Sequence, residues 1–125
     1  VKLDVSETAV DSTGVAYLAK ITSLLELNLW ATQVDDAAAN DLGKMTALYS
    51  LNLDNTKITD ATLPALASLN ELTFLHLGSN DITDANLSHL EGLKNLETMH
   101  LTRTKVTADG QQKLRAALPE TDLKF

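Results

Sequence analysis

Hydrophobic and polar residues alternate along this chain in a pattern that repeats every 24 residues. The markers of the repeat are Thr8, Thr32, Thr56, Asn80 and Thr104. Apolar residues stand five and three positions before each marker, as Leu51 and Leu53 do in the third repeat. Others stand two, ten and thirteen positions after it, beginning with Ile58 in that repeat. A period this constant predicts a solenoid of stacked repeats, because self-similarity at such a spacing marks repeat folds.

The spacing of apolar residues changes inside each repeat. The L-x-L segments have the period of two that is typical of a strand with one buried face. The later L-x-x-L-x-x-L segments are spaced by three, which favours one face of a short helix. Between them, Thr59-Asp60 and Thr83-Asp84 predict helix starts, because their oxygens can accept hydrogen bonds from the first free amides. We interpret Asp36 and its equivalents Asp60 and Asp84 as helix caps favoured by the helix dipole, rather than as calcium ligands.

One repeat cannot bury its apolar face alone, so successive repeats are expected to stack. Their strands then form a parallel sheet with neighbours ~4.8 Å apart, and the helices cover one face of that sheet. We therefore predict an α/β solenoid over residues 1–125, a single domain of five 24-residue repeats. Leu123 and Phe125 continue the inward positions, so residues 121–125 are expected to form a partial sixth strand.

The first predicted strand begins at Val1, and no polar capping segment precedes it. An open end of a solenoid exposes core residues and an unpaired strand edge. We therefore expect this chain to be a fragment of a larger one, in which more repeats or another domain precede Val1, or else this edge to self-associate with another copy.

Two segments, LYSLNLDNTKITDATLPALASL and LTFLHLGSNDITDANLSHLEGL, resemble the leucine-rich-repeat family. They are most similar to its bacterial variety, which has T-x-I-T-D-A-x-L in place of the usual Asn-centred turn. The resemblance covers essentially the whole chain and implies a curved sheet on the concave side and short helices on the convex side. It also implies a protein or peptide partner on the concave sheet. Four of the five markers here are Thr, which offers the turn one hydroxyl where Asn offers two polar ends.

The charge of the chain narrows the class of partner. Ten Lys and Arg residues stand against seventeen Asp and Glu residues, and the formal charge is -7. This balance argues against nucleic acid or an anionic membrane, because both bind basic surfaces, and it favours a neutral or basic partner. The absence of Cys excludes disulfides and thiolate metal sites. No apolar run is long enough to insert across a bilayer, and we expect no cofactor.

Side chains that alternate with the inward leucines form columns across the predicted concave face. Trp30 is the strongest candidate for a partner contact, because it is the only Trp and its register points it away from the core. The alternative is a ring that only covers neighbouring strands. The full set of predicted partner-binding residues is Trp30, Asn28, Asn52, Asp54, Phe74, His76, His100 and Arg103.

His76 and His100 stand one repeat apart in one column, so their Cα atoms are expected ~5 Å apart. With Asp54 diagonal to them, two imidazoles could share a metal ion, but no further ligand is assured, and we predict a solvated pair without metal. A pH response is a second alternative, since both rings would charge near pH ~6–6.5 and repel each other.

No catalytic constellation is evident in the sequence. The chain has no G-x-S-x-G, Walker-type or H-E-x-x-H motif, and a regular solenoid offers no deep cleft. We therefore predict a non-enzymatic protein or peptide binding module that uses its concave sheet. The alternative is a structural spacer or capping module of a larger multidomain protein, with no ligand of its own.

Overall fold

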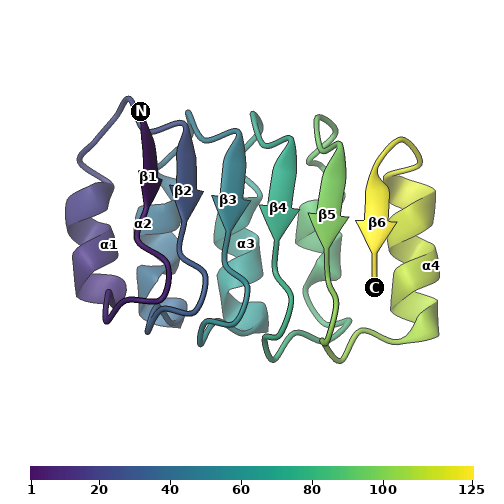
Figure 1. The fold of residues 1–125 in the computed structure, drawn as a ribbon. Coiled ribbons are helices and arrows are strands. Elements are labelled where there is room, and N and C mark those ends of the chain that lie inside the picture. The colour runs from purple at the N-terminus through teal and green to yellow at the C-terminus, as the bar shows by residue number, and fades with distance from the viewer.

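A computed structural model describes residues 1–125, and its strands and helices alternate along the whole chain (Figure 1). The strands are β1 (Lys2–Asp4), β2 (Glu26–Asn28), β3 (Ser50–Asn52), β4 (Phe74–His76), β5 (Thr98–His100) and β6 (Asp122–Lys124). The α-helices are α1 (Ser12–Leu18), α2 (Ala39–Gly43), α3 (Leu63–Leu66) and α4 (Ala108–Ala117). The 3₁₀ turns are η1 (Asp36–Ala38), η2 (Asp60–Thr62) and η3 (Leu87–Leu90). Every repeat thus passes from a strand to a short helical segment.

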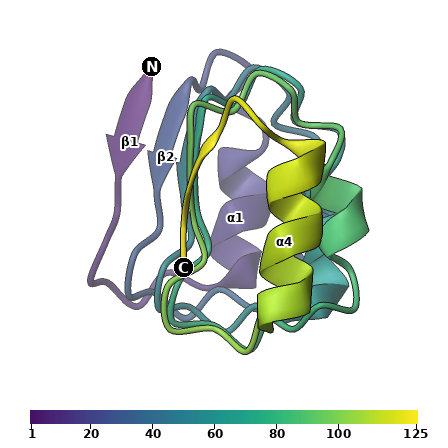
Figure 2. The ribbon, with the colours of Figure 1, turned by 90° about the vertical axis from the view of Figure 1, so that its right-hand side faces the viewer.

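The strands form one parallel sheet in chain order, from β1 to β6. Each strand pairs with the next at a displacement of 24 residues, so that Leu27, Leu51 and Leu75 lie side by side. Figure 2 shows the strands as one layer on the left and the helices as a second layer on the right. This arrangement confirms the predicted α/β leucine-rich-repeat solenoid. No helix is long and apolar enough to cross a membrane.

The core lies between the sheet and the helices. Inward strand residues such as Leu51 and Leu53 are fully buried, as are Leu66 and Leu69 from the helical side. These residues belong to a single cluster of 27 buried side chains. The column of Leu69 is less buried at its two ends, where Ile21 is 40% exposed and Ala117 is only partly buried. No repeat packs on the outer side of Ile21, so the repeating pattern alone overestimated its burial.

The Thr and Asn markers close the turn that follows each strand. The Thr56 hydroxyl donates to the Leu53 carbonyl at 3.0 Å, and the other Thr markers repeat this bond. Asn80 makes more hydrogen bonds than a Thr marker. Its amide donates to the carbonyls of Leu77 and Leu53. Its oxygen accepts from the Thr56 backbone N–H. The two polar ends of Asn80 therefore join its turn to the preceding repeat, which a single hydroxyl does not do.

One residue in every turn has a left-handed backbone. Its φ lies between 54° and 56° at the position directly before each marker. The residues are Glu7, Ala31, Asn55, Ser79 and Arg103. Asn tolerates this region, whereas the other four carry the steric cost of a Cβ there. The turn geometry is therefore imposed by the repeat rather than by the local residue.

Thr59 caps η2 by accepting a hydrogen bond from the Ala61 N–H, as the sequence predicts. In the fourth repeat η3 begins only at Leu87, so the predicted start at Thr83-Asp84 is wrong. The interpretation of Asp36, Asp60 and Asp84 as caps is also wrong. Each of these carboxylates instead accepts hydrogen bonds from a Thr of the following repeat, as Asp36 does from Thr59. Burial pushes the pKa of Asp36 up, but hydroxyls of Thr62 and Thr59 outweigh it and leave that pKa below its ordinary value. The Asp column is a link between repeats.

Candidate interaction surface

The outward side chains of the strands form two rows across the concave face. The first strand positions carry Lys2, Glu26, Ser50, Phe74, Thr98 and Asp122. The third strand positions carry Asp4, Asn28, Asn52, His76, His100 and Lys124. Because the residue between them is turned into the core, both rows face away from the helices. The parallel register therefore brings together predicted site residues from repeats far apart in the sequence.

Residues in the second row hold the chain as it leaves each strand. Asn28 Oδ1 accepts a hydrogen bond at 3.0 Å from the Trp30 N–H, two residues later. Asn52 accepts from the Asp54 N–H in the same way, and His76 Nδ1 accepts from the Gly78 N–H at 3.1 Å. These side chains were predicted only as partner contacts, and the structure gives them this turn-forming role as well.

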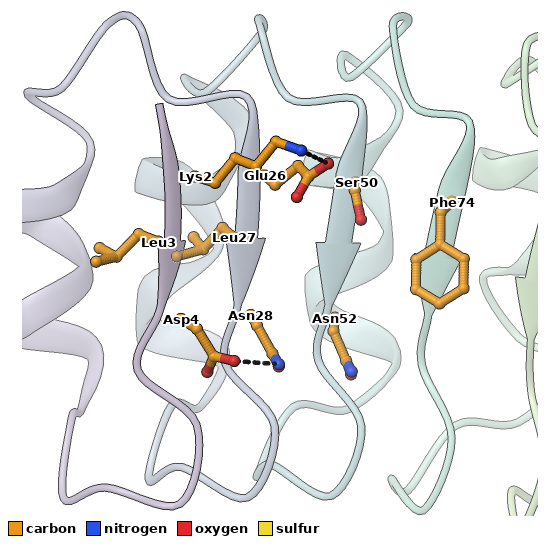
Figure 3. Close-up of a pocket in the computed structure, with 9 residues that line it drawn as sticks. All are labelled: Lys2, Leu3, Asp4, Glu26, Leu27, Asn28, Ser50, Asn52 and Phe74. Carbon is orange, nitrogen blue, oxygen red and sulfur yellow. Dashed lines mark hydrogen bonds and ion pairs between the residues drawn. The ribbon is translucent and has the colours of Figure 1, made fainter.

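A shallow trough lies between the two rows over β1 to β4 (Figure 3). Its volume is about 350 Å³. The lining residues are Lys2, Leu3, Asp4, Glu26, Leu27, Asn28, Ser50, Asn52 and Phe74. Figure 3 shows Lys2 and Glu26 paired at one margin, and Asp4 bonded to Asn28 at the other. Phe74 stands at the β4 end of the trough.

Four charged or polar lining residues of this trough are absent from the predicted site: Asp4 in the second row, and Lys2, Glu26 and Ser50 in the first. Lys2 Nζ lies 3.2 Å from Glu26 Oε1, and the Tyr49 hydroxyl donates to the same carboxylate. This hydroxyl, with Lys2 beside it, holds the pKa of Glu26 below its ordinary value. Lys2, Glu26 and Ser50 each stand six residues before a marker, as Phe74 does, so the register that located Phe74 would have identified them.

Phe74, His76 and His100 form an aromatic cluster on β4 and β5. The two imidazoles stack at 4.3 Å between ring centroids with an interplanar angle of 12°. Phe74 contacts both, at 5.7 Å from His100 and 6.4 Å from His76. The sequence predicted a solvated pair of histidines, but the His76 side chain is only 17% exposed. Ring stacking and the neighbouring Phe74 exclude water that an isolated pair would keep.

His76 is a neutral imidazole in this arrangement. Burial lowers its pKa, with smaller contributions in the same direction from His100 and Arg103 that outweigh the opposing effect of Asp54. Since Nδ1 accepts the Gly78 hydrogen bond, the ring proton lies on Nε2. The 4.0 Å approach of Nδ1 to Asp54 Oδ1 is consequently not an ion pair in this state.

Asp54 lies beneath the surface where the sequence placed an exposed contact. It is only 8% exposed, and its Oδ1 has no hydrogen-bond partner. Its nearest cation is Arg103, whose guanidinium approaches to 3.8 Å while its Nε donates to the Ser79 hydroxyl at 2.7 Å. The expectation that Asp54 is directly accessible is therefore wrong, because the residue is almost fully buried.

Trp30 lies outside the aromatic cluster, in the turn after β2. Its side chain faces outward as predicted, and the residue is 37% exposed. His89, on the helical side, is also exposed. No group of three or more His, Asp or Glu side chains is arranged to hold a metal ion. Trp30 is therefore separate from the cluster of three rings on β4 and β5.

Comparisons with known proteins identify one matching family and several similar structures. Residues 69–90 match the family described as a leucine-rich repeat. A leucine-rich-repeat protein of Leptospira interrogans superposes with a TM-score of 0.72 and 22% identity, over 88% of this chain and 27% of that one. Internalin C2 of Listeria monocytogenes gives 0.60 and 22%, over 98% and 69% of the two chains. The plant peptide hormone receptor RGFR1, in complex with RGF2, gives 0.64 and 18%, over 97% and 19%.

No curated protein matches the sequence. The chain spans about a third or less of the first two similar structures, with 27% of the Leptospira protein and 36% of a Listeria internalin covered. Sequence identities at this level show a common fold. The match of residues 69–90, the parallel sheet in constant register and these superpositions establish that this chain is a leucine-rich-repeat solenoid.

Proposed function

We propose that this chain is a protein or peptide binding module that uses its concave sheet. The observation that carries this proposal is the exposed Trp30 on that face, beside rows of polar groups held on hydrogen-bonded strands. A large aromatic ring on a rigid surface is a typical interface anchor. The trough over β1 to β4 adds a hollow on the same sheet.

The similar structures support this proposal. Their fold is commonly a binding fold, and one of them is a hormone receptor in complex with its peptide. The concave face also favours recognition over chemistry, because no hydrogen bond links a histidine to a Ser or Thr hydroxyl there. We assign the chain no catalytic role.

The proposal predicts that Trp30→Ala abolishes capture of the partner while the fold persists. An affinity capture from an extract of the source organism would compare the native chain with this variant, with retained proteins identified by mass spectrometry. At 37% exposure most of the Trp30 surface is covered by the protein, so the substitution is expected to cost about 1–3 kcal/mol of unfolding free energy, less than at a fully buried aromatic residue.

Tyr17→Ala is the matched control, since Tyr17 is a more exposed aromatic residue but lies on α1, away from the sheet. It should leave capture unchanged. If the native chain and Trp30→Ala retain the same proteins, the binding function of this face is contradicted and a structural spacer becomes the better interpretation.

A further inference from the structure

The third strand positions of β3 to β6 carry Asn52, His76, His100 and Lys124, here called the donor row. The acceptor atoms of its first two members are already used within the chain. Asn52 Oδ1 accepts from the Asp54 N–H, and His76 Nδ1 accepts from the Gly78 N–H. What these side chains still offer is the Asn52 amide NH₂ and the His76 Nε2–H.

The other two members of the donor row have spare hydrogen-bonding capacity. No hydrogen bond within the chain uses the His100 ring, and a neutral imidazole always has one N–H. Lys124 Nζ lies 3.0 Å from Asp122, which occupies one of three ammonium protons. From β3 to β6, each strand therefore presents a free donor on the same line.

The row continues differently over β1 and β2. There the Asn28 amide donates one of its two N–H groups to Asp4 Oδ2 at 3.2 Å. Asp4 itself is a carboxylate whose pKa is held below its ordinary value by hydrogen bonds from Ser6. A carboxylate of the same row thus competes for the donor at this end, and no carboxylate stands in the row from β3 to β6.

The charges near the donor row are two cations and two anions. The exposed Arg103 guanidinium and the Lys124 ammonium are the cations, and the nearby anions are Asp54 and Asp122. Asp54 is buried with Arg103 beside it, and Asp122 is paired with Lys124. Neither anion occupies the line of free N–H groups.

We propose that the donor row binds a carboxylate-bearing segment of the protein partner, with acidic side chains accepting from Asn52, His76, His100 and Lys124. This inference rests on the proposed binding function and adds the chemistry of the partner. Adjacent strands lie ~4.8 Å apart, so the two oxygens of one carboxylate can accept from neighbouring donors. The acidic partner proposed here differs from the neutral or basic partner that the formal charge of -7 favours by itself.

The proposal is tested by titrating the whole chain with three short probes and following amide and imidazole signals by NMR. The probes are acetylated, amidated tetraglutamate, tetraglutamine and tetralysine. Tetraglutamate is expected to shift the Asn52 side-chain amide and the His76 and His100 ring signals. The other two peptides should leave these signals in place.

Two variants remove donors while they keep the local structure. Asn52→Asp retains an oxygen for the Asp54 N–H, and His100→Phe retains a ring to stack on His76. Each should weaken tetraglutamate binding about tenfold or more, the equivalent of one charge-assisted hydrogen bond. Asn40→Asp makes the same charge change on the exposed side of α2 and should bind like the native chain.

Equal shifts with tetraglutamine, stronger shifts with tetralysine, or no shift with any peptide would each overturn the carboxylate site. The same holds if Asn52→Asp and Asn40→Asp weaken binding equally, because bulk charge would then explain the effect. Capture of a protein that depends on Trp30, together with no response to tetraglutamate, would preserve the proposed function and reject only this inference.

Discussion

The Asp60 carboxylate holds Thr83 of the next repeat by two hydrogen bonds, one from the backbone N–H at 2.9 Å and one from the hydroxyl at 2.6 Å. Asp36 bonds Thr59 in the same way, and Asp84 bonds Thr107. Successive helical segments are therefore joined by polar contacts as well as by the leucine core. Since each repeat is stabilised mainly by its neighbours, these contacts should matter for the whole solenoid.

We expect Asp60→Ala to destabilise the protein by about 2–3 kcal/mol, because it removes two bonds and leaves the part-buried Thr83 N–H without an acceptor. Urea denaturation followed by circular dichroism would measure this loss. Asp81→Ala is the control, since Asp81 only pairs with Lys105 on the surface and its removal should cost less than about 1 kcal/mol. Equal losses in the two variants would contradict a special role for the Asp60 link.

Gly78 stands where a side chain has no room. A Cβ there would lie 2.7 Å from His76 Cε1 and 2.9 Å from the Thr102 carbonyl oxygen. Gly78→Ala is expected to cost about 1–3 kcal/mol, because a backbone atom cannot move away as a flexible side chain can. Gly92→Ala is the matched control, since its Cβ would meet nothing within 4 Å, and it should be neutral or slightly stabilising. Thermal unfolding of both variants would measure these two changes in stability.

Ala31 has a φ of 55°, in the left-handed region that disfavours a Cβ. Ala31→Gly removes that cost but gives the unfolded chain more freedom, so we expect a net gain of about 0.5–1 kcal/mol. Ala37→Gly, in η1, should instead lose a similar amount, because no steric cost is relieved there. Calorimetry of both variants would measure the two changes in unfolding free energy. A loss of stability in Ala31→Gly would show that the turn is not strained.

His76 should make the protein less stable as pH falls below about 6.5. Its pKa in the folded chain is lowered from 6.5 by burial, so the unfolded chain binds a proton first. The stability is fully present above the unfolded pKa and declines as pH falls toward the folded one. The free energy of unfolding, measured between pH 7.5 and 5.5, should therefore decrease.

His76→Asn provides the comparison for this pH effect. Asn places an oxygen where Nδ1 accepts from Gly78, as Asn28 and Asn52 do in their own turns, but it does not titrate. The variant should show a smaller loss of stability over the same pH range. Identical pH dependence in both proteins would assign the effect to other groups.

The sequence by itself determined the solenoid and the direction of its side chains. A period of 24 residues sets the register between strands, and alternation around Leu51 and Leu53 sets which side chains are buried. Trp30, His76 and Phe74 could be placed on the concave face for the same reason. Burial along a regular repeat follows from spacing alone, because every repeat meets an equivalent neighbour.

Only the tertiary structure decided which polar atoms remain free. Asp54 is buried beside Arg103, and Asp60 bonds the next repeat instead of capping its own helix. These outcomes depend on atoms brought together from different repeats, and a one-dimensional pattern does not contain their distances. The acceptor ends of Asn52 and His76 are used by the backbone only once the turns have closed. The chemistry of the concave face is therefore a property of the packed solenoid, although its location is a property of the sequence.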